Sequence, residues 1–271
     1  MTPPTPPSPP TPPTPSSHPT RAHSFNTAAA QYAANRPSYP PTLFEAIEAL
    51  ADRPLTGSRV MDIGAGTGIA TTLLHQRGAT VLAVEPGAGM TAEFRRAHPH
   101  IPIVRGNGNA LPLATASADF LTYAQSWHWT DPTHSVPEAL RVLRPGGALA
   151  LWWNTDALDV PWIAAAATRA ERYLGIDQVV EKSGSGARAA ATLAADPSGR
   201  LTFARRQVRW SRRVPLDTHL ANIGSHSAFL VLGEERTAAF LAEERRHLLP
   251  AFPEGIVEET YVVDLLVATR S

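Results

Sequence analysis

Between residues 59 and 153, short apolar runs alternate with stretches that have the apolar spacing of helices, and this alternation constrains the fold more than any other feature. Strands are predicted over residues 59–63, 79–84, 101–104, 119–124 and 147–153, and helices over residues 69–77, 89–98 and 132–143. Strands that alternate with helices form βαβ units, whose strands pair in parallel. This part of the chain therefore predicts a doubly wound α/β fold.

The segments on either side extend this core. Short helices are expected over residues 25–35 and from the Pro41 step to Leu50, because proline is favoured at the first helical position. After Asn154 the sequence predicts helix over residues 160–195, 216–231 and 234–248, and strand near residues 201–210 and 257–269. We place the two strands at the end of the sheet and the helices as a cover over its carboxyl edge. The prediction is a mostly parallel, seven-stranded sheet with a helical cap.

Composition divides the chain into a tail and one domain. Residues 1–24 hold ten of the 26 prolines, so we expect a disordered tail biased toward polyproline II. Residues 25–271 are predicted to form the domain, with a cofactor-binding core at 25–155, cap and sheet-edge insertions at 156–250, and a final strand within 251–271.

Charge and cysteine content limit the classes of ligand and metal site that the chain can have. The 24 basic and 24 acidic residues cancel, which favours a small-molecule partner over nucleic acid or an anionic membrane. No apolar run approaches the roughly 20 residues that span a bilayer, and no secretory signal is visible, so we expect a cytoplasmic protein. Cysteine is absent, which excludes disulfides and thiolate metal sites. His98 and His100 have no further ligands nearby in the sequence, so no metal site is expected.

The loop after the first strand carries three glycines, Gly64, Gly66 and Gly68. Glycine lets a ligand approach the backbone closely, and ligands of open α/β sheets bind at this edge. The dinucleotide fingerprint G-x-G-x-x-G would need glycine where this chain has Ile69. Asp62 also precedes the loop, and a carboxylate there suits a cationic sulfonium and ammonium better than a pyrophosphate.

Glu85 ends the second strand, 21 residues after Gly64. A carboxylate at that position can accept hydrogen bonds from both ribose hydroxyls of a nucleoside ligand. The alternative is a solvated glutamate at a strand end. The loop and the acid together indicate a site for a nucleoside ligand more specifically than either does alone.

Residues 60–90 resemble motif I and the segment that follows it in class I S-adenosylmethionine-dependent methyltransferases. The run Gly106–Leu113 is similar to the adenine-contacting segment of that family, and Arg141–Gly147 resembles its "RVLRPGG" turn. The resemblance covers residues 55–155, and within this class the chain is most similar to the methyltransferase type 11-like family. Residues 32–43 and 125–131 are similar to the branch of trans-aconitate methyltransferase-like enzymes, which act on small molecules.

The resemblance implies S-adenosyl-L-methionine as cofactor and assigns roles to single positions. Asp62, Gly64, Gly66 and Gly68 would hold the methionine end, and Glu85 the ribose. Asn107 and the amide of Gly108 would meet the adenine, and Gln125 would complete the cofactor site. Asn109 stands where the family often has glutamate.

The run from Gln125 to Asp131 follows the fourth strand, beside the expected methyl group. Trp127 and Trp129 suit a pocket for a cation, since aromatic faces attract a sulfonium. His128 is the candidate for a base that deprotonates the acceptor, the alternative being a histidine that only packs. Asp131, before Pro132, is predicted to cap the following helix.

Two further residues, Arg36 and His226, are predicted to lie in the substrate pocket. Each has a plain alternative, a surface arginine and a helix-surface histidine. The predicted activity is methyl transfer to an oxygen, nitrogen or carbon atom of a small molecule, with a carboxylate or hydroxyl favoured. The alternatives are a non-catalytic S-adenosylmethionine-binding or regulatory protein and an NAD-dependent oxidoreductase.

Overall fold

The computed structural model describes residues 33–175 and 201–270. The predicted tail, most of the helix predicted over residues 25–35 and the second half of the one predicted over 160–195 lie outside the described residues. In chain order, the helices and strands are α3 (Pro41–Ala51), β1 (Arg59–Ile63), α4 (Ile69–Gln76), β2 (Thr80–Glu85), α5 (Ala88–Ala97), β3 (Ile103–Arg105), β4 (Ala118–Ala124), the 3₁₀ turn η1 (Trp127–Trp129), α6 (Pro132–Val142), β5 (Leu143–Asp156), α7 (Pro161–Leu174), β6 (Ala204–Pro215), α10 (Leu216–Gly224), α11 (Ser227–Leu232), α12 (Glu234–Leu248) and β7 (Ile256–Thr269).

The strands form one mixed sheet in the order β3-β2-β1-β4-β5-β7-β6. The first five are parallel, whereas β7 pairs antiparallel with both β5 and β6. The strand order reverses direction between β1 and β4, so the carboxyl ends of these two strands flank a crevice in which α/β proteins bind ligands. The predicted fold class, including the two late strands at one end of the sheet, is confirmed.

Helices cover both faces of the sheet. On one face, Leu43 and Phe44 of α3 and Leu74 of α4 pack against inward residues of β1, β2 and β5. On the other face, Val136 and Leu140 of α6 pack against β4 and β5. Neighbouring strand residues point to opposite faces, so both layers bury apolar side chains against a single sheet.

Local sequence explains how several elements begin. Pro41 is at the first helical position of α3, and Pro132 occupies the same position in α6. The Asp131 side chain accepts a hydrogen bond from the Thr133 N–H at 2.9 Å, so it caps α6 as predicted.

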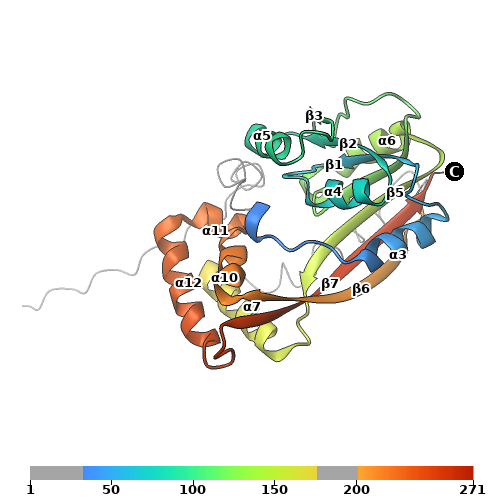
Figure 1. The fold of residues 1–271 in the computed structure, drawn as a ribbon. Helices are drawn as coiled ribbons and strands as arrows, with labels where there is room; N and C mark the ends of the chain where they lie inside the picture. Colours follow the sequence, from blue (N-terminus) through green and yellow to red (C-terminus); the bar gives the residue numbers. More distant parts are fainter. Residues whose placement is uncertain (1–32, 176–200, 271) are drawn as a thin grey trace, which may run out of the picture.

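Three long strands carry the cap. β5 and β7 each have 14 residues and β6 has 12, whereas β4 has only seven. Their excess length projects past the carboxyl edge of the parallel strands, and α7, α10, α11 and α12 gather at the projecting end (Figure 1). A partly buried ion pair joins two of these helices, because Arg169 of α7 contacts the buried Glu244 of α12 through bonds of 2.5 and 2.6 Å.

The structure corrects one predicted helix. The continuous helix expected over residues 216–231 is two helices, α10 and α11, and His226 between them has extended backbone (ψ 142°). The Ser225 hydroxyl donates to the Asn222 carbonyl, which satisfies the end of α10 and allows the chain to turn. None of the helices within residues 33–175 and 201–270 is long and apolar enough to cross a bilayer.

Candidate functional site

The three glycines of the loop after β1 serve different purposes. A Cβ on Gly64 would lie 2.5 Å from Cβ of Ser126, and one on Gly68 would lie 2.7 Å from Cδ2 of His98, so both positions are closed by packing. Gly66 has a φ of +58° and no atom within 4 Å of where its Cβ would stand. The backbone at Gly66 therefore faces open space, as a ligand-binding loop requires.

Glu85 ties the end of β2 to this loop. Its Oε2 accepts from the Gly66 N–H at 2.9 Å, and its Oε1 accepts from the Gly87 N–H at 2.7 Å. Burial raises the pKa of the Glu85 carboxyl, while the two N–H groups and Arg105 act in the opposite direction. Each carboxylate oxygen has a second lone pair, so the group can still accept hydrogen bonds from a ligand.

Asp62 lies beneath the loop. Its side chain is fully buried, and its two oxygens accept hydrogen bonds from the hydroxyls of Thr71 (2.6 Å) and Thr122 (2.9 Å). Burial raises the pKa of Asp62 to about 6, against which the two threonine hydroxyls act. The structure thus places Asp62 as a support that joins β1, α4 and β4, and does not place it at the surface of the loop beside Gly66.

The loop after β3 brings Asn107 and Gly108 to the same edge of the sheet. Oδ1 of Asn107 accepts from the backbone N–H groups of Asn109 (3.0 Å) and Ala110 (3.2 Å), which closes a tight turn. Gly108 is buried, and a Cβ there would lie 2.7 Å from Cγ2 of Thr130. The structure also explains Asn109, whose Oδ1 accepts from the Asp131 N–H and so joins this loop to the start of α6.

Gln125, at the end of β4, has a strained backbone. Its φ is +55°, which is uncommon for a residue other than glycine, and its N–H donates to the Trp152 carbonyl at 2.8 Å. Its side-chain amide donates to the Tyr39 hydroxyl at 3.4 Å, which links β4 to the segment before α3. Such strain persists where surrounding structure enforces it, and it clusters at functional sites.

The two tryptophans of η1 lie in different environments. Trp127, which the sequence analysis placed in the substrate pocket, lies in the core instead. Trp127 is 2% exposed and packs in the core, with its ring centroid 4.7 Å from that of Tyr123. A 3₁₀ turn rotates successive side chains by about 120°, so one of its three residues points into the protein. Trp129 is half-buried, and its ring lies 4.6 Å from the His128 ring.

His128 is held by the neighbouring strand. Nε1 of Trp153, on β5, donates a hydrogen bond to Nδ1 of His128 at 3.1 Å. An indole nitrogen only donates, so Nδ1 is an acceptor and the proton of the neutral ring is on Nε2. In this arrangement His128 presents an N–H donor at Nε2, whereas a general base needs a lone pair there.

Arg36 and His226 meet where the N-terminal segment touches the cap. Nη2 of Arg36 donates to the carbonyl of Ser225, the residue before His226. His226 lines a cavity of about 120 Å³, and the residue as a whole is exposed. Desolvation, aided by the Arg36 guanidinium, holds the pKa of His226 well below its usual range.

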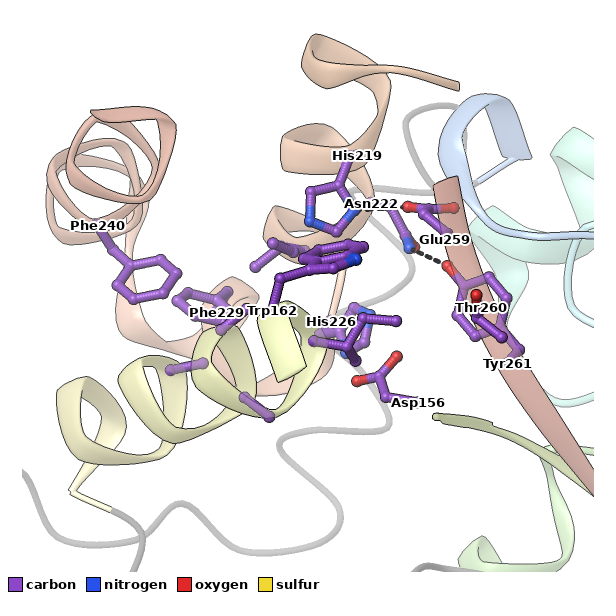
Figure 2. Close-up of a pocket in the computed structure, with 15 residues that line it drawn as sticks. Asp156, Trp162, His219, Asn222, His226, Phe229, Phe240, Glu259, Thr260 and Tyr261 are labelled. Atoms are coloured by element: carbon purple, nitrogen blue, oxygen red, sulfur yellow. Dashed lines mark hydrogen bonds and ion pairs between the residues drawn. The ribbon is translucent and has the colours of Figure 1, made fainter. Parts of the chain in front are cut away.

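The same cavity contains polar residues that the sequence did not single out. They come from the ends of β5 and β7 and from α10, and Figure 2 shows them around the cavity. They are Asp156, His219, Asn222, Glu259 and Tyr261. No local motif contains them, because the cavity forms only when strands and helices distant in sequence come together. Within the described part of the chain, no cluster of three or more His, Asp or Glu side chains is arranged to hold a metal ion.

The chain resembles known proteins over its core and over most of its length. Residues 61–151 match a family model described as "Methyltransferase domain". An uncharacterized methyltransferase from Mycobacterium tuberculosis is 36% identical over 230 residues, which are 85% of this chain and 87% of the relative. A demethylmenaquinone methyltransferase from Beutenbergia cavernae is 37% identical over 117 residues, covering 43% of this chain and 47% of that protein.

Among solved structures, a protein of Anaeromyxobacter dehalogenans that is provisionally described as a type II methyltransferase has a similar fold. The two superpose with a TM-score of 0.65 at 25% sequence identity, over 86% of this chain and 97% of the other.

Proposed function

Because this chain belongs to the methyltransferase family, we propose that it transfers a methyl group from S-adenosyl-L-methionine to a small-molecule acceptor. The predicted family is thus confirmed, while the trans-aconitate methyltransferase-like branch stays a prediction. One observation carries the choice of cofactor: the Glu85 carboxylate is bonded to the Gly66 N–H of a loop that faces open space.

The residues at the carboxyl edge fit S-adenosyl-L-methionine in shape and charge. Gly66 leaves room for the methionine part against the backbone, and Glu85 can accept from the ribose hydroxyls. Asn107 and Gly108 would meet the adenine, with Gln125 beyond them. Asp62 and Glu85 both have pKa values raised by burial, so a cation bound nearby would stabilise their charged forms. In this proposal Asp62 acts through the loop and does not touch the cofactor.

When bound, S-adenosyl-L-methionine supplies an electrophilic methyl group, whose bond to sulfur breaks as a lone pair of the acceptor attacks, leaving a neutral thioether. An oxygen or nitrogen acceptor loses one proton in the overall reaction. The chain's contribution is chiefly alignment of the reacting atoms, which can supply most of the rate. The Nε2–H of His128 would hold the acceptor by a hydrogen bond, and Trp153 would fix the direction of that bond.

The same contacts disfavour an NAD-dependent oxidoreductase. A pyrophosphate binds to free backbone N–H groups at the start of a helix. Here the Gly66 N–H already donates to the Glu85 carboxylate, which would repel a phosphate. A non-catalytic protein that binds S-adenosyl-L-methionine would share this cofactor site, so only turnover separates it from an enzyme.

Calorimetry with S-adenosyl-L-methionine, S-adenosyl-L-homocysteine and NAD tests the cofactor. We expect the first two to bind and NAD not to bind, and NAD binding without a response to S-adenosyl-L-methionine would overturn the proposal. Incubation with methyl-labelled cofactor and a panel of small alcohols, amines and acids then tests catalysis. A protein that binds the cofactor but labels none of the panel would fit the regulatory alternative.

A further inference from the structure

The cavity in the cap has a polar end and an apolar body. It lies between α7, α10 and α11 and the projecting ends of β5 and β7, with Trp162, Phe229 and Phe240 along one side (Figure 2). Alanines of α7 complete that side. An apolar cavity of 150 Å³ can hold benzene, so about 120 Å³ suits a body of five or six heavy atoms.

Asn222 presents an unused acceptor to the polar end. Its side-chain Nδ2 donates to the Tyr261 hydroxyl at 3.2 Å. Oδ1 of Asn222 is the other end of the amide, and it is buried without a hydrogen-bond partner in a residue that is 5% exposed.

His219 presents a second buried nitrogen. Its Nδ1 lies 2.7 Å from Oε1 of Glu259, so Nδ1 carries a proton. The other oxygen of Glu259 accepts from Arg212 at 2.5 Å, which holds the carboxylate in place. Nε2 of His219 is buried without a partner and, in the neutral ring, is an acceptor.

Asp156 also lines the cavity, at the end of β5, but it is exposed. The buried groups without partners are therefore Oδ1 of Asn222 and Nε2 of His219. Burying polar groups without partners costs free energy, so two such groups in one cavity indicate that a ligand completes their hydrogen bonds.

We infer that this cavity binds a small molecule that carries a hydroxyl or amino group on a short apolar body. Asn222, His219 and Asp156 all offer acceptors, so the ligand must bring donors. A ligand with a carboxylate head group brings only acceptors and would face the Asp156 charge.

Three probes with the same five-carbon body test the head group: pentylamine, 1-pentanol and pentanoate. Binding to the full chain saturated with S-adenosyl-L-homocysteine is measured by ligand-observed NMR titration. We expect the amine and the alcohol to bind and pentanoate to bind at least roughly tenfold more weakly, since unpaired buried acceptors reject such a ligand. Pentanoate binding as tightly as the other two would overturn the inference, as would binding of none of them.

Two variants assign the binding to this cavity. Asp156→Asn removes the charge and should weaken pentylamine more than 1-pentanol, and Asn222→Leu should weaken both. Asp159→Asn is the matched control, because Asp159 is exposed and pairs with Arg209 on the surface. Equal binding by Asp156→Asn, Asn222→Leu and the control would also overturn the inference.

Calorimetry with S-adenosyl-L-methionine on the same samples separates the two claims. Cofactor binding without any head-group preference would remove the inference alone. Failure of the cofactor to bind would remove the proposed function alone.

Discussion

Nε1 of Trp153 lies 3.1 Å from Nδ1 of His128, and the hydrogen bond between them determines which nitrogen of the histidine carries its proton. Trp153 is on β5, and His128 is in η1, the turn that follows the neighbouring strand β4. The sequence suggested that His128 acts as a general base. Because Nδ1 accepts this bond, Nε2 carries the proton and is a donor instead.

His128→Ala should lower kcat by about tenfold at every pH, which is the cost of losing one oriented hydrogen bond. Trp153→Phe keeps the ring but removes the donor, so it should shift kcat in the same direction by a smaller factor. Profiles of kcat against pH for both variants, with cofactor affinity measured alongside, check this. A loss of 10²–10⁴-fold that recovers as the pH rises would instead identify His128 as a general base.

Glu85→Gln should weaken S-adenosyl-L-methionine binding by roughly 10–100-fold, because hydrogen bonds to a charged carboxylate are stronger than those to an amide. The melting temperature should change little, since the glutamine oxygen can still accept from the Gly66 or Gly87 N–H. Calorimetry and thermal unfolding measure the two effects. Glu93→Gln is the control, an exchange at an α5 glutamate that pairs with Arg96 at the surface; unchanged affinity in Glu85→Gln would remove this residue from the site.

Gly66→Ala should lower cofactor affinity far more than stability. The new Cβ meets no atom of the protein within 4 Å, but it occupies the space in which we place the methionine part. The positive φ at Gly66 costs about 1–2 kcal/mol for an alanine. Gly57→Ala is a matched control, because Gly57 also has a positive φ and open surroundings but lies before β1. Equal loss of affinity in both variants would contradict a ligand at Gly66.

Asp62→Asn should change how stability depends on pH. The pKa of Asp62 is about 6 in the folded protein and 3.8 in the unfolded chain. Between these values the folded state keeps a proton that the unfolded chain releases. Stability therefore falls as the pH rises from about 4 to 6, by about 3 kcal/mol for a difference of two pKa units. The asparagine variant lacks this loss, and urea unfolding at pH 4, 5, 6 and 7 measures the difference. Parallel curves for the two proteins would contradict the assignment.

Much of the half of the molecule that carries the glycine loop could be predicted from sequence, because its signals are local. The glycine spacing after β1, the acid that ends β2 and the Asp131-Pro132 helix start each involve residues adjacent in the chain. Such local signals determine the backbone directly through sterics and capping.

The cap and its cavity could not be predicted in the same way. Asp156, Asn222 and Glu259 come from three elements, and they become neighbours only when β5 and β7 pair beyond the rest of the sheet. Trp127 and Trp129 look equivalent in sequence, yet the 3₁₀ turn sends one of them into the core. The burial of a side chain at a loop depends on tertiary packing, which the loop sequence alone does not contain.

The position of β6 at the end of the sheet also affects how the chain folds while it is being synthesised. Among the described strands β6 pairs only with β7, from Ala204 opposite Val267 to Pro215 opposite Ile256. A ribosome makes β6 first and must then add residues 216–255 before its partner appears. During that interval the unpaired strand is a template for association with other chains. Charged side chains along the strand discourage such association, and β6 carries five of them, namely Arg205, Arg206, Arg209, Arg212 and Arg213.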